Sequence, residues 1–254
     1  MARSNGRGMG FFYSAGEILS LLYQSICWCR AAPANLDKIV RHMYEFGNAT
    51  LPIGAILAVF TGGVLALQAG SRLAEFGAQA TIGGIVGASM AKELGPVMIS
   101  LLVAGRVGSA MAAEVGAMSV YEEIDALRTL HIDPVRYLVM PRLIASFITL
   151  PFLTLYGTVI GWLGGAVVSN FNAKIRVNFS EYFDSLFDTI GFRDIGDGLI
   201  KSAVFAVIIT VVSCHQGFKT SGGPEAIAAS TTKAVVASFI LIFASDYFIT
   251  RLLM

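Results

Sequence analysis

Long apolar runs separated by short polar segments dominate the sequence, and their lengths predict membrane-spanning helices. A helix needs about 20 mostly apolar residues to cross the hydrocarbon core of a bilayer. Two runs reach this length without a charged residue, at positions 49–69 and 143–169. Three more contain one or two charges and lie at positions 79–105, 198–214 and 234–250, the last being short enough that partial insertion is an alternative. The pattern predicts an all-α membrane protein with about five transmembrane helices.

The first 48 residues follow a different pattern, in which apolar side chains are interspersed with polar and charged ones. The apolar members are Phe11, Phe12, Ile18, Leu19, Leu22, Ile26 and Trp28. This spacing is typical of an amphipathic helix in the plane of the membrane interface, and an ordinary helix packed on the bundle is the alternative. We therefore divide the chain into an N-terminal cytoplasmic or interfacial segment, 1–48, and a transmembrane domain, 49–254.

Small residues recur at every fourth position in three stretches. The three ladders are Gly83, Gly87, Ala91 and Gly95; Ala104, Gly108, Ala112 and Gly116; and Gly157, Gly161, Gly165 and Ser169. Small residues at this spacing let helix backbones approach closely in lipid. We expect tight helix contacts, within one copy or at a dimer seam, at Gly95, Gly105, Gly108, Gly116, Gly161 and Gly165.

Lysine and arginine are distributed unevenly between the segments that connect the spans. With the N-terminus inside, the cytoplasmic segments hold eleven of these residues and the external segments hold five. Because positive charge favours the cytoplasmic side, we expect a cytoplasmic N-terminus and an external C-terminus. The acidic segment at positions 170–197 is then external, with a short helix around 180–189.

Composition excludes several classes of protein. Hydrophobic residues make up 55% of the chain and charged residues 14%, below the roughly 25% of a soluble domain. The net charge of +1 and the lack of a basic stripe argue against nucleic-acid binding. The three cysteines and three histidines have no metal-site spacing. No phosphate loop and no hydrolase or metalloprotease motif occurs, so we expect no catalytic residue, no metal and no bound cofactor in this chain.

The polar segment from Ser119 to Pro134 connects the second and third spans. Ser119 and Glu122 have the spacing of a capping box, which predicts a cytoplasmic helix over 120–130. Its apolar positions fall on one face, so the helix either docks into a partner protein or caps the bundle. The residues expected to make this contact are Glu122, Glu123, Ile124, Asp125, Leu127 and Arg128.

Four ionisable residues lie inside the predicted spans: Lys92, Glu93, Lys201 and Asp246. Such residues are costly in a membrane and are functional candidates for that reason. One interpretation is internal ion pairing, with Glu93 and Asp246 as the acids available to a buried cation. The other is a cavity in which Lys92 and Lys201 hold an anionic headgroup while apolar side chains hold acyl tails.

Several motifs together resemble the MlaE/YrbE family of ABC permeases. They are Lys92-Glu-Leu-Gly-Pro-Val97, the run from Leu102 to Ala110, Ala113-Glu-Val-Gly116, Glu123-Ile-Asp-Ala-Leu127, the run from Asp133 to Leu138 with Pro141-Arg142, Lys201-Ser-Ala-Val-Phe205, and the run from Thr231 to Val236. They cover positions 40–254 in order, and Asp246 fits the late acidic position of the family. Lys92 stands where many members have arginine, which changes the geometry available to a headgroup. The segment Gly222–Ser230 also departs from the family pattern, and its role stays open.

The resemblance implies a homodimeric permease subunit in a Gram-negative inner membrane that moves phospholipids between the inner and outer membranes. It implies a cytoplasmic ABC ATPase that binds ATP and Mg²⁺, a periplasmic MCE-domain protein and, in some systems, a STAS-domain subunit. The helix at 120–130 is then the coupling helix seated on the ATPase, and Lys92, Glu93 and Lys201 line or brace the lipid cavity. An ion-coupled secondary transporter and a non-transporting scaffold are the alternatives.

Overall fold

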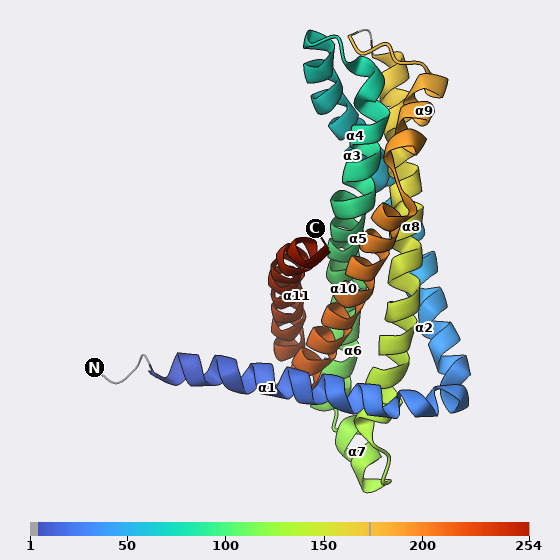
Figure 1. The fold of residues 1–254 in the computed structure, drawn as a ribbon. Coiled ribbons are helices and arrows are strands. Elements are labelled where there is room, and N and C mark those ends of the chain that lie inside the picture. Colours follow the sequence, from blue (N-terminus) through green and yellow to red (C-terminus); the bar gives the residue numbers. More distant parts are fainter. Residues whose placement is uncertain (1–4, 173, 254) are drawn as a thin grey trace. The chain divides into compact units, whose positions relative to one another are not determined.

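The computed structural model describes residues 5–172 and 174–253, with side chains from residue 14 onward apart from those of Ala31 and Ala34. The described chain is helical, with no strand in these ranges (Figure 1). Five of its helices are long and apolar enough to cross a membrane: Leu51–Glu75, Gln79–Val120, Val135–Phe171, Phe192–Phe218 and Pro224–Leu253. These helices confirm the five predicted spans, and each extends several residues beyond its apolar run because the helix continues into flanking polar positions.

Two helices and a short 3-10 segment precede the first span. They are α1 (Asn5–Trp28), η1 (Cys29–Asn35) and α2 (Leu36–Asn48). The side chains of Phe11 and Phe12, which we counted in the amphipathic pattern, lie outside the described ones. Further along α1, Leu21 and Ser25 are buried, whereas Leu19, Tyr23 and Ile26 are exposed at helical spacing. An exposed apolar stripe is what an interfacial helix needs, and its location in a membrane stays a prediction.

The second span is a single long helix with two wide turns of π type. Its parts are η2 (Gln79–Thr81), α4 (Ile82–Ser89), the π turn η3 (Met90–Leu94), α5 (Gly95–Val103), the π turn η4 (Ala104–Gly108) and α6 (Ser109–Val120). The apolar run at 79–105 predicted this span, and the structure extends its helix to Val120. Arg106 does not interrupt the helix, which continues for more than three turns beyond it.

The connector between the second and third spans contains a shorter helix than we predicted. This helix, α7, runs from Glu123 to Thr129. Glu122 has the left-handed φ of 59°, so α6 ends before it and α7 starts after it. The predicted capping box is wrong because the Ser119 hydroxyl donates to the Thr220 carbonyl instead of capping α7. Figure 1 shows α7 as a short helix beyond the end of α6.

The remaining elements are η5 (Val135–Val139), α8 (Met140–Phe171), α3 (Leu51–Glu75), α9 (Phe179–Thr189), α10 (Phe192–Phe218) and α11 (Pro224–Leu253). The short helix expected around 180–189 is thus confirmed as α9. The segment Gly222–Ser230 is not a loop over most of its length, because Pro224 begins α11. Proline is well suited to the first turn of a helix, where its missing N–H has no partner to lose.

The chain forms two compact units, each assembled from distant parts of the sequence. The first unit contains the chain up to Tyr44, Ala104–Phe147 and Ala206–Leu241; the second contains Glu45–Val103, Ile148–Phe205 and the chain from Ile242. The core of the first unit includes Leu21, Val115, Ile124, Leu138 and Cys214. The core of the second includes Ile82, Met90, Trp162, Tyr182 and Leu186. The division of the chain at residue 48 stays a prediction.

Close backbone contact explains several of the glycines in the second unit. A Cβ atom on Gly62 would overlap the carbonyl group of Gly161, where α3 meets α8. A Cβ on Gly83 would overlap the carbonyl of Tyr182, where α4 meets α9. Helices in lipid associate through such close approach rather than through a hydrophobic driving force.

The glycines that we expected at helix contacts differ in their surroundings. Added Cβ atoms would be crowded at Gly95 by Thr158, at Gly116 by Thr220, at Gly161 by Met90 and at Gly165 by Tyr182. Gly108 is buried. Gly105 is exposed, and a Cβ there would meet no atom within 4 Å in this chain. A packing role for Gly105 therefore requires a second polypeptide and stays a prediction.

Replacing Tyr182 with phenylalanine is expected to leave the free energy of unfolding unchanged or to raise it by up to about 1 kcal/mol. The Tyr182 phenol is buried, and its oxygen has no hydrogen-bond partner among the described residues. Burial raises the pKa of this phenol well above its usual value. Thermal unfolding in detergent measures the effect, with Tyr247→Phe at an exposed tyrosine as the control. A loss of more than 1 kcal/mol would show that the hydroxyl has a stabilising partner.

Candidate functional site

Lys201 of α10 is the centre of a polar cluster inside the membrane-spanning part of the second unit. Its side chain is 2% exposed, and its ammonium nitrogen lies 2.6 Å from Glu93 Oε2 and 3.1 Å from Asp246 Oδ1. The same nitrogen donates to the Thr250 hydroxyl at 2.7 Å, and that hydroxyl donates to Glu93 Oε1 at 3.2 Å. We call Lys201, Glu93, Asp246 and Thr250 the charged cluster.

The charged cluster compensates its buried cation fully. Removing an ammonium group from water costs several kcal/mol, which only close opposite charges and hydrogen bonds offset. Two carboxylates and a hydroxyl supply these contacts to Lys201. Our expectation that Glu93 and Asp246 pair with a buried cation agrees with this geometry, and the cation is Lys201.

Lys92 faces a different partner from its neighbour Glu93. Its ammonium nitrogen lies 2.7 Å from Asp194 Oδ1, and its side chain is 46% exposed. Lys92 and Glu93 both belong to the π turn η3, which has wider spacing than an α-helical turn. Lys92 is therefore the more accessible of the two candidate lysines.

A cavity of about 270 Å³ adjoins both the charged cluster and the ion pair of Lys92 with Asp194. It is lined by Lys92, Glu93, Arg193, Asp194, Asp197, Lys201, Thr250 and Leu253. The lining holds three cations and three acids, so its formal charge is balanced. The volume lies below the range of about 300–1,000 Å³ that is usual for drug-sized ligands. It suits a polar group such as a headgroup, but not a complete lipid.

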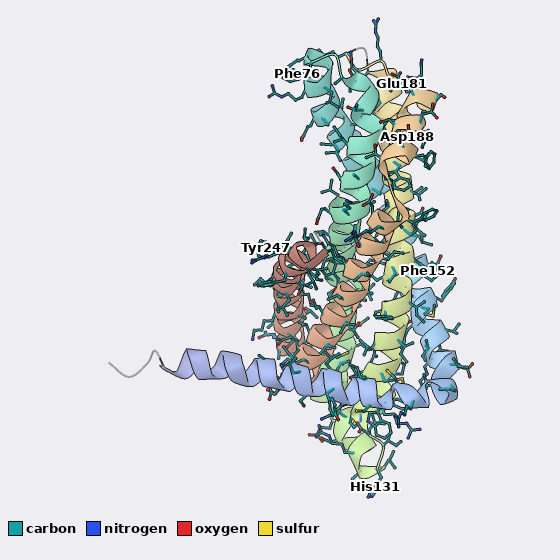
Figure 2. All side chains as sticks on the ribbon, in the orientation of Figure 1. Phe76, His131, Phe152, Glu181, Asp188 and Tyr247 are labelled. Atoms are coloured by element: carbon teal, nitrogen blue, oxygen red, sulfur yellow. The ribbon has the colours of Figure 1, made fainter. Side chains whose placement is uncertain are left out.

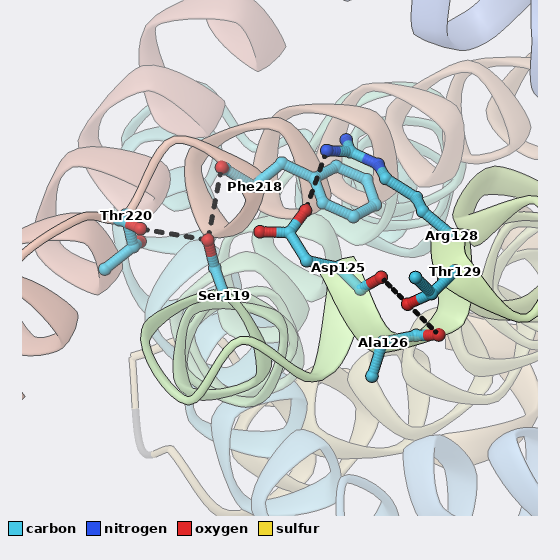
Figure 3. A network of polar contacts seen from close by, with 7 residues as sticks. All are labelled: Ser119, Asp125, Ala126, Arg128, Thr129, Phe218 and Thr220. Atoms are coloured by element: carbon cyan, nitrogen blue, oxygen red, sulfur yellow. Dashed lines mark hydrogen bonds and ion pairs between the residues drawn. The ribbon is translucent and has the colours of Figure 1, made fainter.

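The connector presents acidic side chains around one buried apolar contact. Ile124 is buried in the core of the first unit, and Leu127 packs against that core. Leu130, the last apolar position of the predicted helix 120–130, is 69% exposed and lies just after the end of α7 at Thr129. The side chains of Glu123 and Asp125 are exposed, and Asp125 accepts a hydrogen bond from Arg128 at 3.0 Å (Figure 3).

The chain matches the family described as Permease MlaE over residues 39–252. The chain belongs to the MlaE permease family. It is 43% identical over 243 residues to a probable ABC transporter permease protein of Rickettsia typhi, an alignment that covers 96% of this chain and 93% of the relative. Family membership confirms the resemblance seen in the motifs and identifies the chain as a multi-pass transporter permease.

Relatives of this MlaE-family permease also occur in Synechocystis and in Arabidopsis thaliana. A probable ABC transporter permease protein of Synechocystis is 40% identical over 223 residues, covering 86% of this chain and 82% of the relative. The chloroplastic Protein TRIGALACTOSYLDIACYLGLYCEROL 1 of Arabidopsis thaliana is 36% identical over 242 residues, covering 95% of this chain and 66% of the relative.

Sequence reasoning about this MlaE-family permease missed Asp194, Arg193 and Thr250. Asp194 and Arg193 lie in the acidic segment 170–197, which we predict to be external, and the structure places them in the first turn of α10. Thr250 is one of several hydroxyl residues in an apolar run, and nothing in the linear pattern distinguishes it from Ser238 or Ser245. The wide turn η3, which directs Lys92 toward Asp194, has no sequence signal that we recognise.

Proposed function

We propose that this permease is the membrane subunit of an ABC transporter that moves phospholipids between the inner and outer membranes. The observation that carries the proposal is the charged cluster: a lysine that is 2% exposed, inside a membrane-spanning helix, beside a polar cavity. A structural ion pair needs no adjoining cavity. A headgroup site needs both accessible charge and space, which Lys92 and the cavity supply.

The proposed mechanism uses two copies of the chain, which enclose an apolar cavity open toward the periplasm. The phosphate of a lipid lies near Lys92, while its tails exchange one apolar environment for another at little cost. Closure of the cavity then changes the relative affinity for the lipid in the two states, which is what makes it move. Lys201 stays compensated by the carboxylates of Glu93 and Asp246 throughout.

The energy comes from a separate cytoplasmic ATPase, which binds ATP and Mg²⁺ and contacts α7. A periplasmic MCE-domain protein exchanges lipid with the permease, and a STAS-domain subunit completes the complex in some systems. The inner membrane is the proposed location, with the N-terminus in the cytoplasm and the C-terminus in the periplasm. The family membership and the names of the relatives support the ATPase partner.

Purification of the complex from native membranes, with mass spectrometry of proteins and lipids, tests the proposal. Bound phospholipid and a co-purifying ATPase are the expected result, and reconstituted vesicles should transfer lipid only when ATP is added. Transfer without the ATPase would favour an ion-coupled secondary transporter, for which the ionisable residues of the charged cluster are suitable. A complex without lipid would favour a scaffold.

Replacing Glu123 with lysine is expected to lower lipid-stimulated ATP hydrolysis by about tenfold while leaving the helical fold intact. Glu123 is exposed in the first turn of α7, where its negative charge interacts favourably with the positive end of the helix dipole. Reversing its charge changes the surface offered to the ATPase without removing a buried contact. Phosphate release by the reconstituted complex measures the rate.

Glu181→Lys provides the matched control for this charge reversal. Glu181 is exposed on α9, and Figure 2 shows its side chain with that of Asp188 on this helix. In the proposed orientation α9 lies on the external side, so the ATPase cannot contact it. Equal rates for Glu123→Lys and wild type would reject the coupling role of α7.

A further inference from the structure

Polar contacts at Ser119 and at Asp133 in the first unit connect the two ends of the α6–α8 connector to other elements. At its start, the Ser119 hydroxyl donates to the Thr220 carbonyl at 3.0 Å and lies 3.5 Å from the Phe218 carbonyl (Figure 3). At its end, the Trp28 indole N–H donates to Asp133 Oδ2 at 3.0 Å. The start of the connector is thus held by the last residue of α10 and the segment directly after it, and its end is held by α1.

A third contact joins α1 to the end of α10. Lys219, directly after α10, forms an ion pair with Glu17 of α1 and donates to the Ser14 hydroxyl at 3.3 Å. His215, one turn earlier, has its Nε2 atom 3.7 Å from the Glu17 carboxylate. The three contacts form a closed circuit of connector, α10 and α1. We call Ser119, Thr220, Lys219, Glu17, Trp28 and Asp133 the connector frame.

The contact between Trp28 and Asp133 is well supported by its surroundings. Asp133 uses its other carboxylate oxygen to accept the backbone N–H of Val135 at 2.8 Å. The guanidinium of Arg136 lies 5.2 Å from the centre of the Trp28 ring, within the range of a cation–π interaction. Asp133 therefore fixes the start of η5 and the end of α1 at the same time.

Part of the connector frame borders a cavity beside the packed core of the first unit. The cavity has a volume of about 460 Å³ and is lined by residues of α1, the connector and the end of α10, including Gln24, Arg128, Asp133 and Phe218. Ile124 anchors one face of α7 in the core, and the polar contacts restrain the two ends of the connector. Loss of one of these contacts should loosen the end that it holds, because side chains do not fill the cavity there.

Both junctions of α7 have backbone conformations that need such a restraint. Glu122 and His131, which flank the helix, have φ values of 59° and 58°. The left-handed region costs a non-glycine residue about 1–2 kcal/mol and persists where the surroundings enforce it. Neither junction is a glycine, so both need support from their surroundings, which the frame supplies at the two ends of the connector while Ile124 anchors α7 in the core.

We infer that Trp28 and Ser119 are positioning residues that act through α7 in coupling ATP hydrolysis to transport. The inference rests on the proposed function and extends it to α1, which lies outside the sequence motifs of the connector. In a closed frame, force applied to α7 displaces α1 and α10 together. With one contact missing, α7 rotates at its left-handed junctions, and hydrolysis proceeds without a matching displacement of the spans.

The test measures lipid transferred per ATP hydrolysed. The full-length chain is reconstituted with its ATPase in vesicles of phosphatidylethanolamine and phosphatidylglycerol containing a fluorescent phosphatidylethanolamine. Trp28→Phe keeps an aromatic ring near Arg136, although a smaller one, and removes the N–H donor. Ser119→Ala removes the hydroxyl, and Ser119→Thr restores it. We expect the ratio to fall about fivefold in Trp28→Phe and Ser119→Ala and to recover in Ser119→Thr.

Tyr23→Phe is the control, because Tyr23 lies on the exposed face of α1 and loses one donor without affecting the frame. Its ratio should equal that of wild type. The inference is overturned if Trp28→Phe and Ser119→Ala keep the wild-type ratio, or if Ser119→Thr is as impaired as Ser119→Ala. Wild-type complex that transfers no lipid on ATP addition would instead overturn the proposed function.

Discussion

Replacing Lys201 with methionine is expected to reduce ATP-driven phospholipid transfer by about tenfold or more. The change keeps most of the side-chain volume and removes the cation that lies 2.6 Å from Glu93 and 3.1 Å from Asp246. The two carboxylates then face each other without a counter-charge and move apart or take up a proton. We expect the free energy of unfolding to fall by about 2–3 kcal/mol as well, less than for a sealed site because the cavity admits water.

Two measurements separate the effects of Lys201→Met on transport and on folding. Thermal unfolding in detergent gives stability, and transfer of a fluorescent phospholipid between vesicles gives transport at a temperature where the variant stays folded. Lys233→Met serves as the control, because Lys233 is exposed on α11 and lies outside the charged cluster. Transport by Lys201→Met within twofold of wild type would mean that the charged cluster only stabilises helix packing.

Replacing Gly62 with alanine is expected to lower the free energy of unfolding by about 3 kcal/mol or more. The added Cβ atom would overlap the Gly161 carbonyl group, and backbone cannot yield as a flexible side chain does. Helices α3 and α8 would have to separate, with loss of the contacts around Gly62 and Gly164. Thermal unfolding in detergent measures the loss.

Gly105→Ala is the matched control, since its Cβ would have open space in this chain. We expect a change within about 0.5 kcal/mol, because alanine has the better helix propensity and nothing in the chain resists it. Equal stability of Gly62→Ala and wild type would contradict the close contact of α3 with α8. Dissociation of a dimer by Gly105→Ala, with an unchanged single-chain fold, would place Gly105 at the seam between copies.

The number and order of the spans were readable from the sequence because each requires a long apolar run. Their ends were not, because polar residues continue a helix once it leaves the apolar region. The helix of the second span runs on past Arg106 to Val120, and α10 begins at Phe192, before the apolar run that revealed it. Hydropathy detects the part of a helix that needs lipid, and hydrogen bonding decides where the helix stops.

The charged cluster was predictable in outline, since a buried lysine needs an acid and only a few acids lie within the spans. The choice of partners was not predictable, because it depends on helix rotation. Lys201 forms ion pairs with both Glu93 and Asp246, and Lys92 forms an ion pair with Asp194, which lies in the segment that we predict to be external. These pairings join residues up to 108 positions apart.

At the start of α7, a hydrogen bond to a residue distant in the sequence replaces the capping box that the local pattern predicts. Ser119 and Glu122 have the spacing of a capping box, but Ser119 belongs to the last turn of α6. Its hydroxyl donates to a carbonyl 101 residues away. A capping box gains about 1 kcal/mol, and an equivalent hydrogen bond within the first unit replaces it. The local sequence around Ser119 gives no sign that the Thr220 carbonyl lies within reach of its hydroxyl.

The wide turn η3 also limits how this region of the gene can change. A π turn holds one residue more than the α-helical turn that it replaces. Deleting a single codon within Met90–Leu94 would close it to a regular α-helical turn and leave the orientation of the following segment unchanged, because the extra residue lies in the widened turn. Gly95 would keep its contact with Thr158, but the neighbours Lys92 and Glu93 could no longer both face their ion-pair partners. The length of this stretch is therefore tied to the ion pairs rather than to the packing of the rest of the span.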